Sequence, residues 1–224
     1  MHNQVIEVIG VVVALIFAIT FHEAAHGIVA RWLGDNTASR MGRVSLNPIA
    51  HIDPFGTIIL PGMLLLAGTP FLFGYAKPVP VDFSKLHPQR FGQILVAGSG
   101  PMMNLLLALG SGYLLHINPH ASTLGNDILV QSLRINVMLA IFNMIPILPL
   151  DGGRIFNALL PRSLQQLMEP LEKYGMLILL GLMMIPMITG FLFGHPIEVL
   201  REFLMPIYKF VMNKILILSG HGGF

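Results

Sequence analysis

The feature that most constrains the fold is a long apolar run near the N-terminus, residues 5–33, which contains two histidines and two glutamates. A helix needs about 20 apolar residues to cross a bilayer, so this run is long enough to span a membrane. Only 11% of the residues of the chain are charged, against about 25% in a typical soluble domain. The sequence therefore predicts an integral membrane protein, in which ionisable groups inside a span indicate a functional site.

Three ionisable groups of this run form a His-Glu-x-x-His pattern at His22, Glu23 and His26. Two histidines four residues apart lie one helical turn from each other on the same face, where both can bind one zinc ion. Glu23 follows the first histidine and can act as a general base on water. Because this short pattern also occurs by chance in unrelated proteins, its meaning depends on the rest of the chain.

Later segments are also apolar enough to form membrane helices. Residues 91–116 and 128–148 are predicted to span the bilayer and to form, with the first run, a core of three transmembrane helices. Residues 175–193 are a further predicted span, and the charged tail at 196–218 fits either a fifth span or a helix on the membrane surface. The predicted fold is an all-α polytopic membrane protein with one or two C-terminal helices.

The region between the first two spans is irregular. At residues 55–73 an apolar stretch is broken by proline and glycine into pieces shorter than a crossing, which predicts a re-entrant hairpin. Residues 37–47 alternate loosely, and residues 74–81 have the proline content of an edge strand. We therefore expect short β-strands on the cytoplasmic side.

The distribution of lysine and arginine predicts the orientation of the helices. Six basic residues lie at the end of the first predicted span or between it and the second, namely Arg31, Arg40, Arg43, Lys77, Lys85 and Arg90, whereas the loop at 117–127 has none. Cytoplasmic loops are enriched in these residues, so the first and third helices should run inward and the second outward. The C-terminal parts of the first and third helices then lie at one depth, towards the cytoplasm.

The end of the third predicted helix offers a carboxylate at that depth. Asp151 follows two prolines and precedes two glycines, so it should lie on unwound backbone near the membrane boundary. A catalytic zinc usually has three protein ligands, and the absence of cysteine excludes thiolates. Asp151 is thus the best-placed third ligand beside His22 and His26, with hydrolysis of an amide bond as the predicted reaction.

Three separated motifs together resemble the site-2 protease family of intramembrane zinc metalloproteases. They are the His-Glu-x-x-His motif at 22–26, a Gly-Pro-x-x-Asn motif at 100–104, and a stretch at 143–153 similar to the family's Asn-x-x-Pro-x-Pro-x-Leu-Asp-Gly-Gly. In the last motif two residues rather than one separate the prolines. The resemblance covers about residues 17–154 and is to compact prokaryotic members without a PDZ-like or nucleotide-sensing domain.

The resemblance implies one zinc ion per chain, held by His22, His26 and Asp151, with Glu23 as the catalytic acid and base. It implies a multi-pass protein of the prokaryotic cytoplasmic membrane, with its active site towards the cytoplasm. Its partners would be the lipid bilayer and a membrane protein substrate, cleaved in or near a transmembrane segment in regulated intramembrane proteolysis.

Supporting residues are also expected. The resemblance implies that Asn104 and Asn143 line the site, where they would hold the substrate backbone or an oxyanion. His51 has two interpretations, a turn residue that satisfies local backbone groups or a group near the zinc that contacts substrate.

Residues 1–154 are expected to form the catalytic membrane core, and residues 155–224 to add C-terminal membrane helices to the same domain. The basic residues are too dispersed to predict nucleic acid binding. Two other functions stay open. A membrane metal transporter or sensor would use the same ligands but gives Glu23 no role, and a non-catalytic relative would bind transmembrane helices without cutting them.

Overall fold

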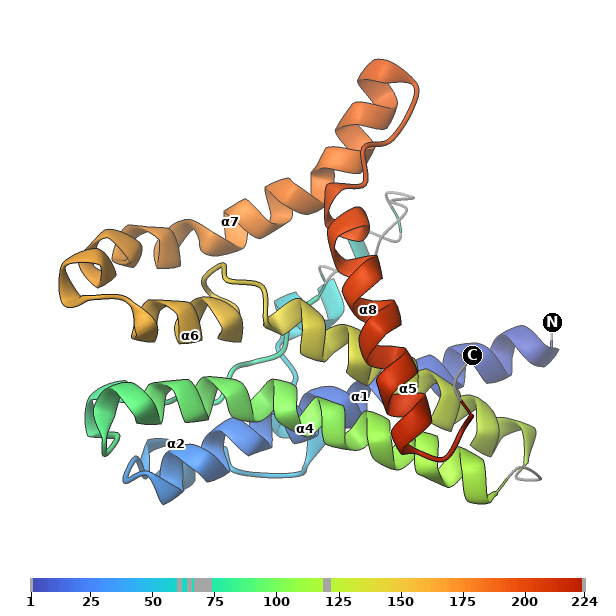
Figure 1. The fold of residues 1–224 in the computed structure, drawn as a ribbon, viewed down its shortest axis with the longest axis horizontal. Helices are drawn as coiled ribbons and strands as arrows, with labels where there is room; N and C mark the ends of the chain where they lie inside the picture. Colours follow the sequence, from blue (N-terminus) through green and yellow to red (C-terminus); the bar gives the residue numbers. More distant parts are fainter. Residues whose placement is uncertain (1, 60–61, 64–65, 67–73, 119–121, 223–224) are drawn as a thin grey trace.

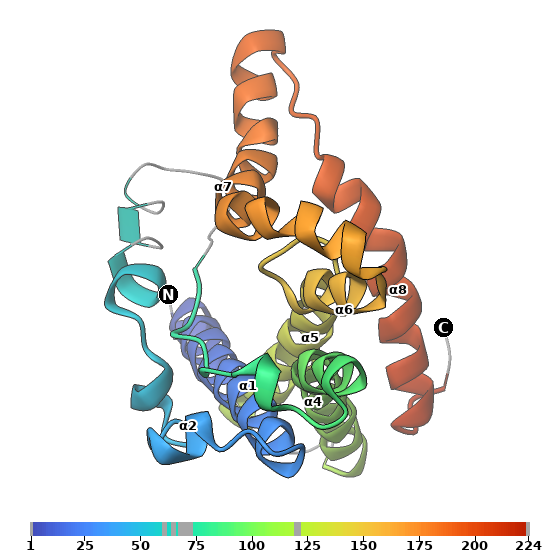
Figure 2. The same ribbon diagram turned by 90° about the vertical axis from the view of Figure 1, so that its left-hand side faces the viewer.

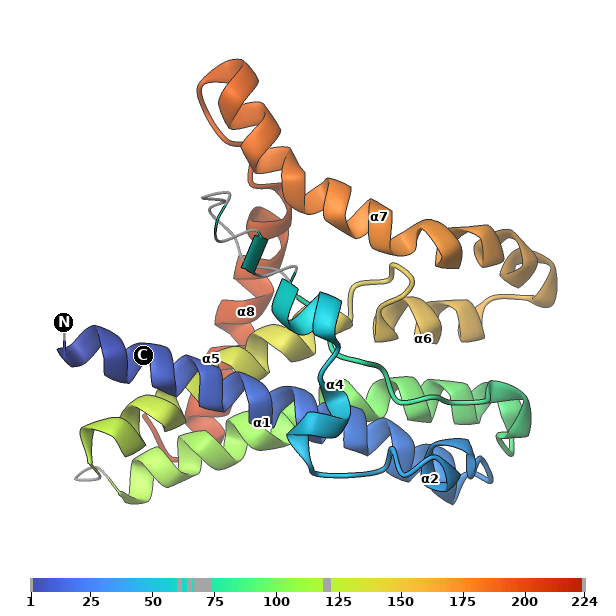
Figure 3. The same ribbon diagram turned by 180° about the vertical axis from the view of Figure 1, so that it is seen from behind.

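The computed structural model describes residues 2–59, 62–63, 66, 74–118 and 122–222, and every regular element in these ranges is a helix. Three long helices form the centre, α1 (His2–Trp32), α4 (Gln89–Ile117) and α5 (Thr123–Asn143). Each packs against the other two, and α1 and α5 run in one direction while α4 runs in the other, as Figure 1 and Figure 3 show. The predicted all-helical fold is confirmed.

Small side chains let the three central helices approach closely. Ala18 on α1, Ala97 and Ala108 on α4 and Ala140 on α5 are at most 3% exposed. In lipid, helices associate through close van der Waals packing and interhelical hydrogen bonds, and small residues permit both. The outward faces carry large apolar residues such as Val12, which suits helices surrounded by lipid.

Within the described ranges, three helical stretches are long and apolar enough to cross a bilayer, Ile6–Trp32, Gln89–Ile117 and Lys173–Phe193. They match three of the four predicted spans. The fourth, at 128–148, is helical only as far as Asn143, the end of α5, and α5 is less apolar than these three stretches. Polar side chains lower its hydropathy. Gln131 and Asn136 are buried, whereas Arg134 is exposed.

The C-terminal part consists of α6 (Asp151–Leu159), α7 (Arg162–Phe193) and α8 (Val199–Leu218). α6 lies against α4, and α8 crosses α4 and α5 at a steep angle, as Figure 1 and Figure 2 show. α8 is anchored by apolar contacts of Leu204 and Ile215 with α4 and α5. α7 has a largely exposed apolar surface, since only 6% of its most apolar 18-residue stretch is buried.

The two predicted strands are wrong. Residues 37–47 contain the short helix α2 (Thr37–Arg40) followed by turns, and residues 74–81 have no regular secondary structure. Pro78 and Pro80 lack an N–H group, so this segment cannot donate a regular ladder of hydrogen bonds. The predicted re-entrant hairpin at 55–73 lies mostly outside the described residues, and its described start belongs to the π-helix η2 (Pro54–Ile59).

Residues 74–81, which we call the strap, are held by single hydrogen bonds to other parts of the chain. The N–H groups of Tyr75 and Lys77 donate to the carbonyls of Gly56 and of His51, the last residue of the 3-10 helix η1 (Pro48–His51). The strap leads into a second 3-10 helix, η3 (Phe83–Lys85).

The segment after the strap is tied to the end of α1 by the fully buried carboxylate of Asp35. One oxygen of this carboxylate accepts from the N–H of Asp82 over 2.7 Å, and the other accepts from the N–H and hydroxyl of Thr37. Asp35 therefore fixes where the strap ends relative to α1.

Candidate metal centre

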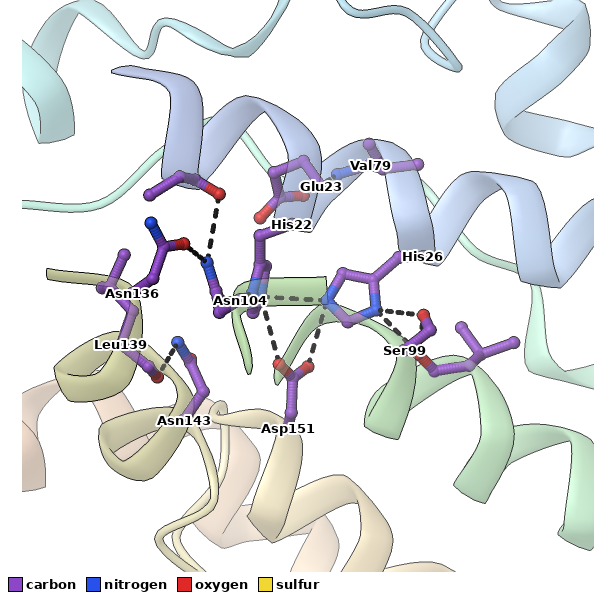
Figure 4. Close-up of polar contacts among 12 residues, drawn as sticks. His22, Glu23, His26, Val79, Ser99, Asn104, Asn136, Leu139, Asn143 and Asp151 are labelled. Atoms are coloured by element: carbon purple, nitrogen blue, oxygen red, sulfur yellow. Dashed lines mark hydrogen bonds and ion pairs between the residues drawn. The ribbon is translucent and has the colours of Figure 1, made fainter. Parts of the chain in front are cut away.

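Three side chains converge where the C-terminal part of α1 meets the start of α6. Nε2 of His22 lies 3.2 Å from Oδ2 of Asp151, and Nε2 of His26 lies 3.4 Å from its Oδ1. The two Nε2 atoms are 3.1 Å apart, and the candidate ligand atoms of all three residues lie within 4.8 Å of one another. Figure 4 shows the three side chains pointing towards a common centre. The structure thus brings together the three predicted zinc ligands.

The donor set and its surroundings fit a zinc ion. Two imidazole nitrogens and one carboxylate form a common ligand set of catalytic zinc, which keeps a further position open. The side chain of His22 is 10% exposed and those of His26 and Asp151 are 12% exposed. Oδ2 of Asp151 is buried without a hydrogen-bond partner. A buried carboxylate oxygen needs a cation or a donor to offset its desolvation, and zinc would supply that partner.

Both histidines are oriented by α4 through their other ring nitrogen. Nδ1 of His22 donates to Oδ1 of Asn104 over 2.6 Å, and Nδ1 of His26 donates to the carbonyl oxygen of Val96 over 2.7 Å. Since these oxygens accept, Nδ1 of each ring carries a proton, and in the neutral ring that zinc binds Nε2 keeps its lone pair. Each imidazole therefore presents Nε2 to the metal position, as a zinc ligand requires.

Gly100 lets α4 lie directly against the two imidazoles. A Cβ atom here would lie 2.5 Å from Cε1 of His22 and 2.6 Å from Nε2 of His26. Val96, Gly100 and Asn104 are spaced by four residues and so share one face of α4. The small residues at 98–100 predicted that another helix would approach closely here, which Gly100 confirms. The anchoring of His26 by Val96 was not predicted, and its one signal in the sequence is the spacing of four residues, which matches that of the two histidines.

Asp151 is positioned by the tight turn that follows α5. The predicted unwound backbone ends one residue earlier than expected, because residues 144–150 are non-helical but Asp151 is the first residue of α6. Gly152 and Gly153 let the turn pack closely on α6. A Cβ atom on Gly152 would lie 2.2 Å from the carbonyl oxygen of Met144. The helix dipole also favours a carboxylate at the start of a helix.

Glu23 lies beside the histidines and is held by the strap (Figure 4). Its Oε2 accepts a hydrogen bond from the N–H of Val79 over 2.8 Å. The adjoining part of the strap is held by Arg43, whose Nη2 donates to the carbonyls of Lys77 over 2.8 Å and Pro78 over 3.2 Å. The strap thus fixes the orientation of the predicted general base, a contact that the sequence did not predict.

A cavity of about 560 Å³ opens onto the three candidate ligands and Glu23. Its walls come from α1, α4, α5, α6, α7 and the strap, and most of the side chains that line it are apolar. Asn143, at the end of α5, lines the cavity, and its Nδ2 donates to the carbonyl of Leu139 over 3.0 Å. A cavity of this size accommodates a short extended peptide.

The other two predicted supporting residues do not line this cavity. Asn104 is fully buried behind His22, so its contact is with that ring and not with a bound peptide. The ring of His51 donates from Nε2 to the carbonyl of Ser45 over 2.8 Å, while its own carbonyl accepts from Lys77 of the strap. His51 therefore supports the strap through its backbone carbonyl.

Comparison with known proteins agrees with the resemblance seen in the motifs. Residues 125–186 match the family described as "Peptidase family M50". The chain is 34% identical over 214 residues to "Putative zinc metalloprotease YwhC" of Bacillus subtilis, with 92% of this chain and 93% of the relative covered. It is 26% identical over 187 residues to "Putative zinc metalloprotease Rip2" of Mycobacterium tuberculosis, with 82% and 70% covered. No solved structure matches the chain significantly.

Proposed function

Since the chain belongs to peptidase family M50, the site-2 proteases, and is a zinc metallopeptidase, we propose that it cuts a peptide bond in or near a transmembrane segment of a membrane protein. The observation that carries this proposal is the convergence of His22, His26 and Asp151 beside Glu23, in a cavity walled by apolar helices. A cavity between membrane helices is accessible to a transmembrane segment that unwinds locally.

In this proposal His22, His26 and Asp151 hold one zinc ion per chain. When bound, zinc would polarise a substrate carbonyl and lower the pKa of bound water to about 7. Glu23 takes a proton from the attacking water and delivers it to the leaving amine. The Val79 N–H supports this role, because it holds the Glu23 carboxylate in place at the cavity wall.

The substrate has to unwind before it can be cut, because the carbonyls of an intact helix are already hydrogen-bonded. Asn143 is placed to stabilise the unwound segment. An amide nitrogen carries two hydrogens, and the bond to Leu139 uses one, so the second can be donated to a substrate carbonyl oxygen. Asn104 acts by holding His22, and His51 by holding the strap.

We further propose that the site lies towards the cytoplasm in a cell membrane. The basic residues between α1 and α4 lie near the end of the bundle that carries the metal centre, whereas the loop between α4 and α5 has no lysine or arginine. The positive-inside rule places such a basic end in the cytoplasm. A membrane protein cleaved here would release its cytoplasmic part, which is the outcome of regulated intramembrane proteolysis.

The decisive experiment compares wild type with Glu23→Gln, both purified in detergent and incubated with a substrate that contains one transmembrane helix. General acid–base catalysis contributes about 10²- to 10⁴-fold, so we expect cleavage to fall by that factor while one zinc per chain is retained. Glu7→Gln, the same exchange at an exposed position of α1, is the matched control and should cleave normally.

Equal cleavage by Glu23→Gln and wild type would refute the proposed role of Glu23. Absence of cleavage by both would favour a relative that binds transmembrane helices without cutting them. Metal flux into liposomes that survives in Glu23→Gln would favour a transporter, because transport assigns this carboxylate no chemistry. Mapping the cut by mass spectrometry to a site outside the transmembrane segment and its flanks would refute the proposed substrate class.

A further inference from the structure

A chain of hydrogen-bonded side chains runs from His22 into the centre of the three-helix core. Asn104 accepts from His22 through Oδ1 and donates from Nδ2 to Oδ1 of Asn136 over 2.7 Å. Asn136, on α5, donates from its own Nδ2 to the backbone carbonyl of Ser132 over 2.9 Å. Asn104 is 0% and Asn136 1% exposed, so no solvent competes for these bonds. Figure 4 shows Asn104 between His22 and Asn136.

The direction of each of these hydrogen bonds follows from the last acceptor, the backbone carbonyl of Ser132. A backbone carbonyl can only accept, so Asn136 must turn its NH₂ group towards Ser132 and its oxygen towards Asn104. Asn104 must then turn its NH₂ group towards Asn136 and its oxygen towards His22. That oxygen requires a proton on Nδ1 of His22, which leaves the lone pair on Nε2.

We propose that Asn136 is a positioning residue for the zinc site, although it touches neither the cavity nor the candidate ligands. Asn136 fixes the orientation of the Asn104 amide and thereby keeps His22 in the form that binds metal. This inference rests on the proposed ligand set and adds to it an orienting residue from α5. His26 needs no such relay, because its acceptor is the backbone carbonyl of Val96, which cannot rotate.

A second, weaker contact sets the expected size of the effect. Nδ2 of Asn104 also lies 3.3 Å from the carbonyl oxygen of Ala18, a longer bond than the one to Asn136. Without Asn136, Asn104 keeps this partial constraint and His22 is held less firmly. Loss of groups that orient a ligand ordinarily weakens metal binding by about 10- to 100-fold, so we expect the lower end of that range, about tenfold.

The test is a zinc titration of Asn136→Leu in competition with a chromophoric chelator, on full-length protein in detergent. The matched control is Ser111→Ala. Ser111 donates to the carbonyl of Leu107 over 2.8 Å and shares a hydrogen bond of 2.8 Å with the hydroxyl of Ser132. It is also buried in the core, but its hydroxyl bonds to Leu107 and Ser132 and not to Asn104. We expect zinc binding to weaken about tenfold in Asn136→Leu and to stay within twofold of wild type in Ser111→Ala.

A double variant separates positioning from general loss of packing. If Asn136 acts through Asn104, zinc binding by Asn104→Leu should not weaken further when Asn136→Leu is added. Unchanged binding in Asn136→Leu, an equal loss in Ser111→Ala, or additive losses in the double variant would each overturn the inference. Tight zinc binding that survives His22→Ala would refute the ligand set itself, which distinguishes failure of the proposed site from failure of the relay.

Discussion

Replacing Gly100 by alanine tests whether α4 sets the positions of the zinc ligands. Inside a helix this exchange ordinarily stabilises a protein by about 0.5–1 kcal/mol, because glycine loses more backbone entropy on folding. Here the added methyl would lie 2.5 Å from Cε1 of His22 and 2.6 Å from Nε2 of His26, whereas ordinary contact begins at 3.4 Å. The rings must therefore retreat by about 0.9 and 0.8 Å, the differences between these distances.

A shift of this size is incompatible with the metal site. Ligand distances in a working site stay within about 0.2 Å of their preferred values, and both rings are tethered to the same helix that carries the new methyl. We expect Gly100→Ala to bind zinc about 100-fold more weakly or worse, and to lose cleavage in proportion. Its α-helical content should be unchanged, since only the site is disturbed.

The assay is zinc competition with a chelator, together with far-ultraviolet circular dichroism and thermal unfolding of the metal-free protein. Gly98→Ala is the matched control on the same helix, because a Cβ there meets only Cδ1 of Ile155 at 3.9 Å. It should bind zinc as wild type does. Wild-type affinity in Gly100→Ala, or an equal loss in Gly98→Ala, would refute the reasoning.

Three other outcomes are expected. Val79→Pro removes the N–H that holds Glu23. Since hydrogen bonds to charged groups contribute about 1.5–3 kcal/mol, kcat should fall about 10- to 100-fold while the zinc content stays unchanged. An unaltered kcat would contradict this. Burial alone would raise the pKa of Asp35, but hydrogen bonds from Thr37 and Asp82 outweigh it and lower that pKa. The stabilisation by ionised Asp35 is therefore complete above about pH 4 and is lost as pH falls further. Asp35→Asn should accordingly lower Tm at pH 7, and the Tm values of variant and wild type should converge in acid. A constant difference in Tm at every pH would contradict this. Chelation should abolish cleavage and added zinc restore it, and cleavage that persists in zinc-free protein would exclude a metallopeptidase.

The convergence of His22, His26 and Asp151 could be predicted because each belongs to a local pattern with a chemical reason. The helical spacing of His22 and His26 shows that they share a face. The basic residues between the first two spans place Asp151 at the same depth. Both inferences need only periodicity and charge, which a single sequence contains.

The supporting contacts could not be predicted, because they depend on how one helix is rotated against another. Asn104 was expected to line the site, but the register of α4 against α1 places it behind His22. Residues 74–81 were expected to form an edge strand, yet they have no regular structure and their amides bond to Glu23 and to isolated carbonyls. Asn136 gave a signal that was not used, since a polar residue in an apolar helix usually has a specific partner.

The anchoring of both imidazoles on α4 has a consequence for how the protein matures. α1 and α6 supply the proposed ligands while α4 and α5 orient them, so a chain whose α4 has not yet docked would offer zinc no organised site. Metal would therefore bind the assembled state selectively, and at 1,000 times its Kd it would stabilise that state by about 4.1 kcal/mol. Under the proposed function, a newly made chain would gain hydrolytic activity only after its central helices have packed together.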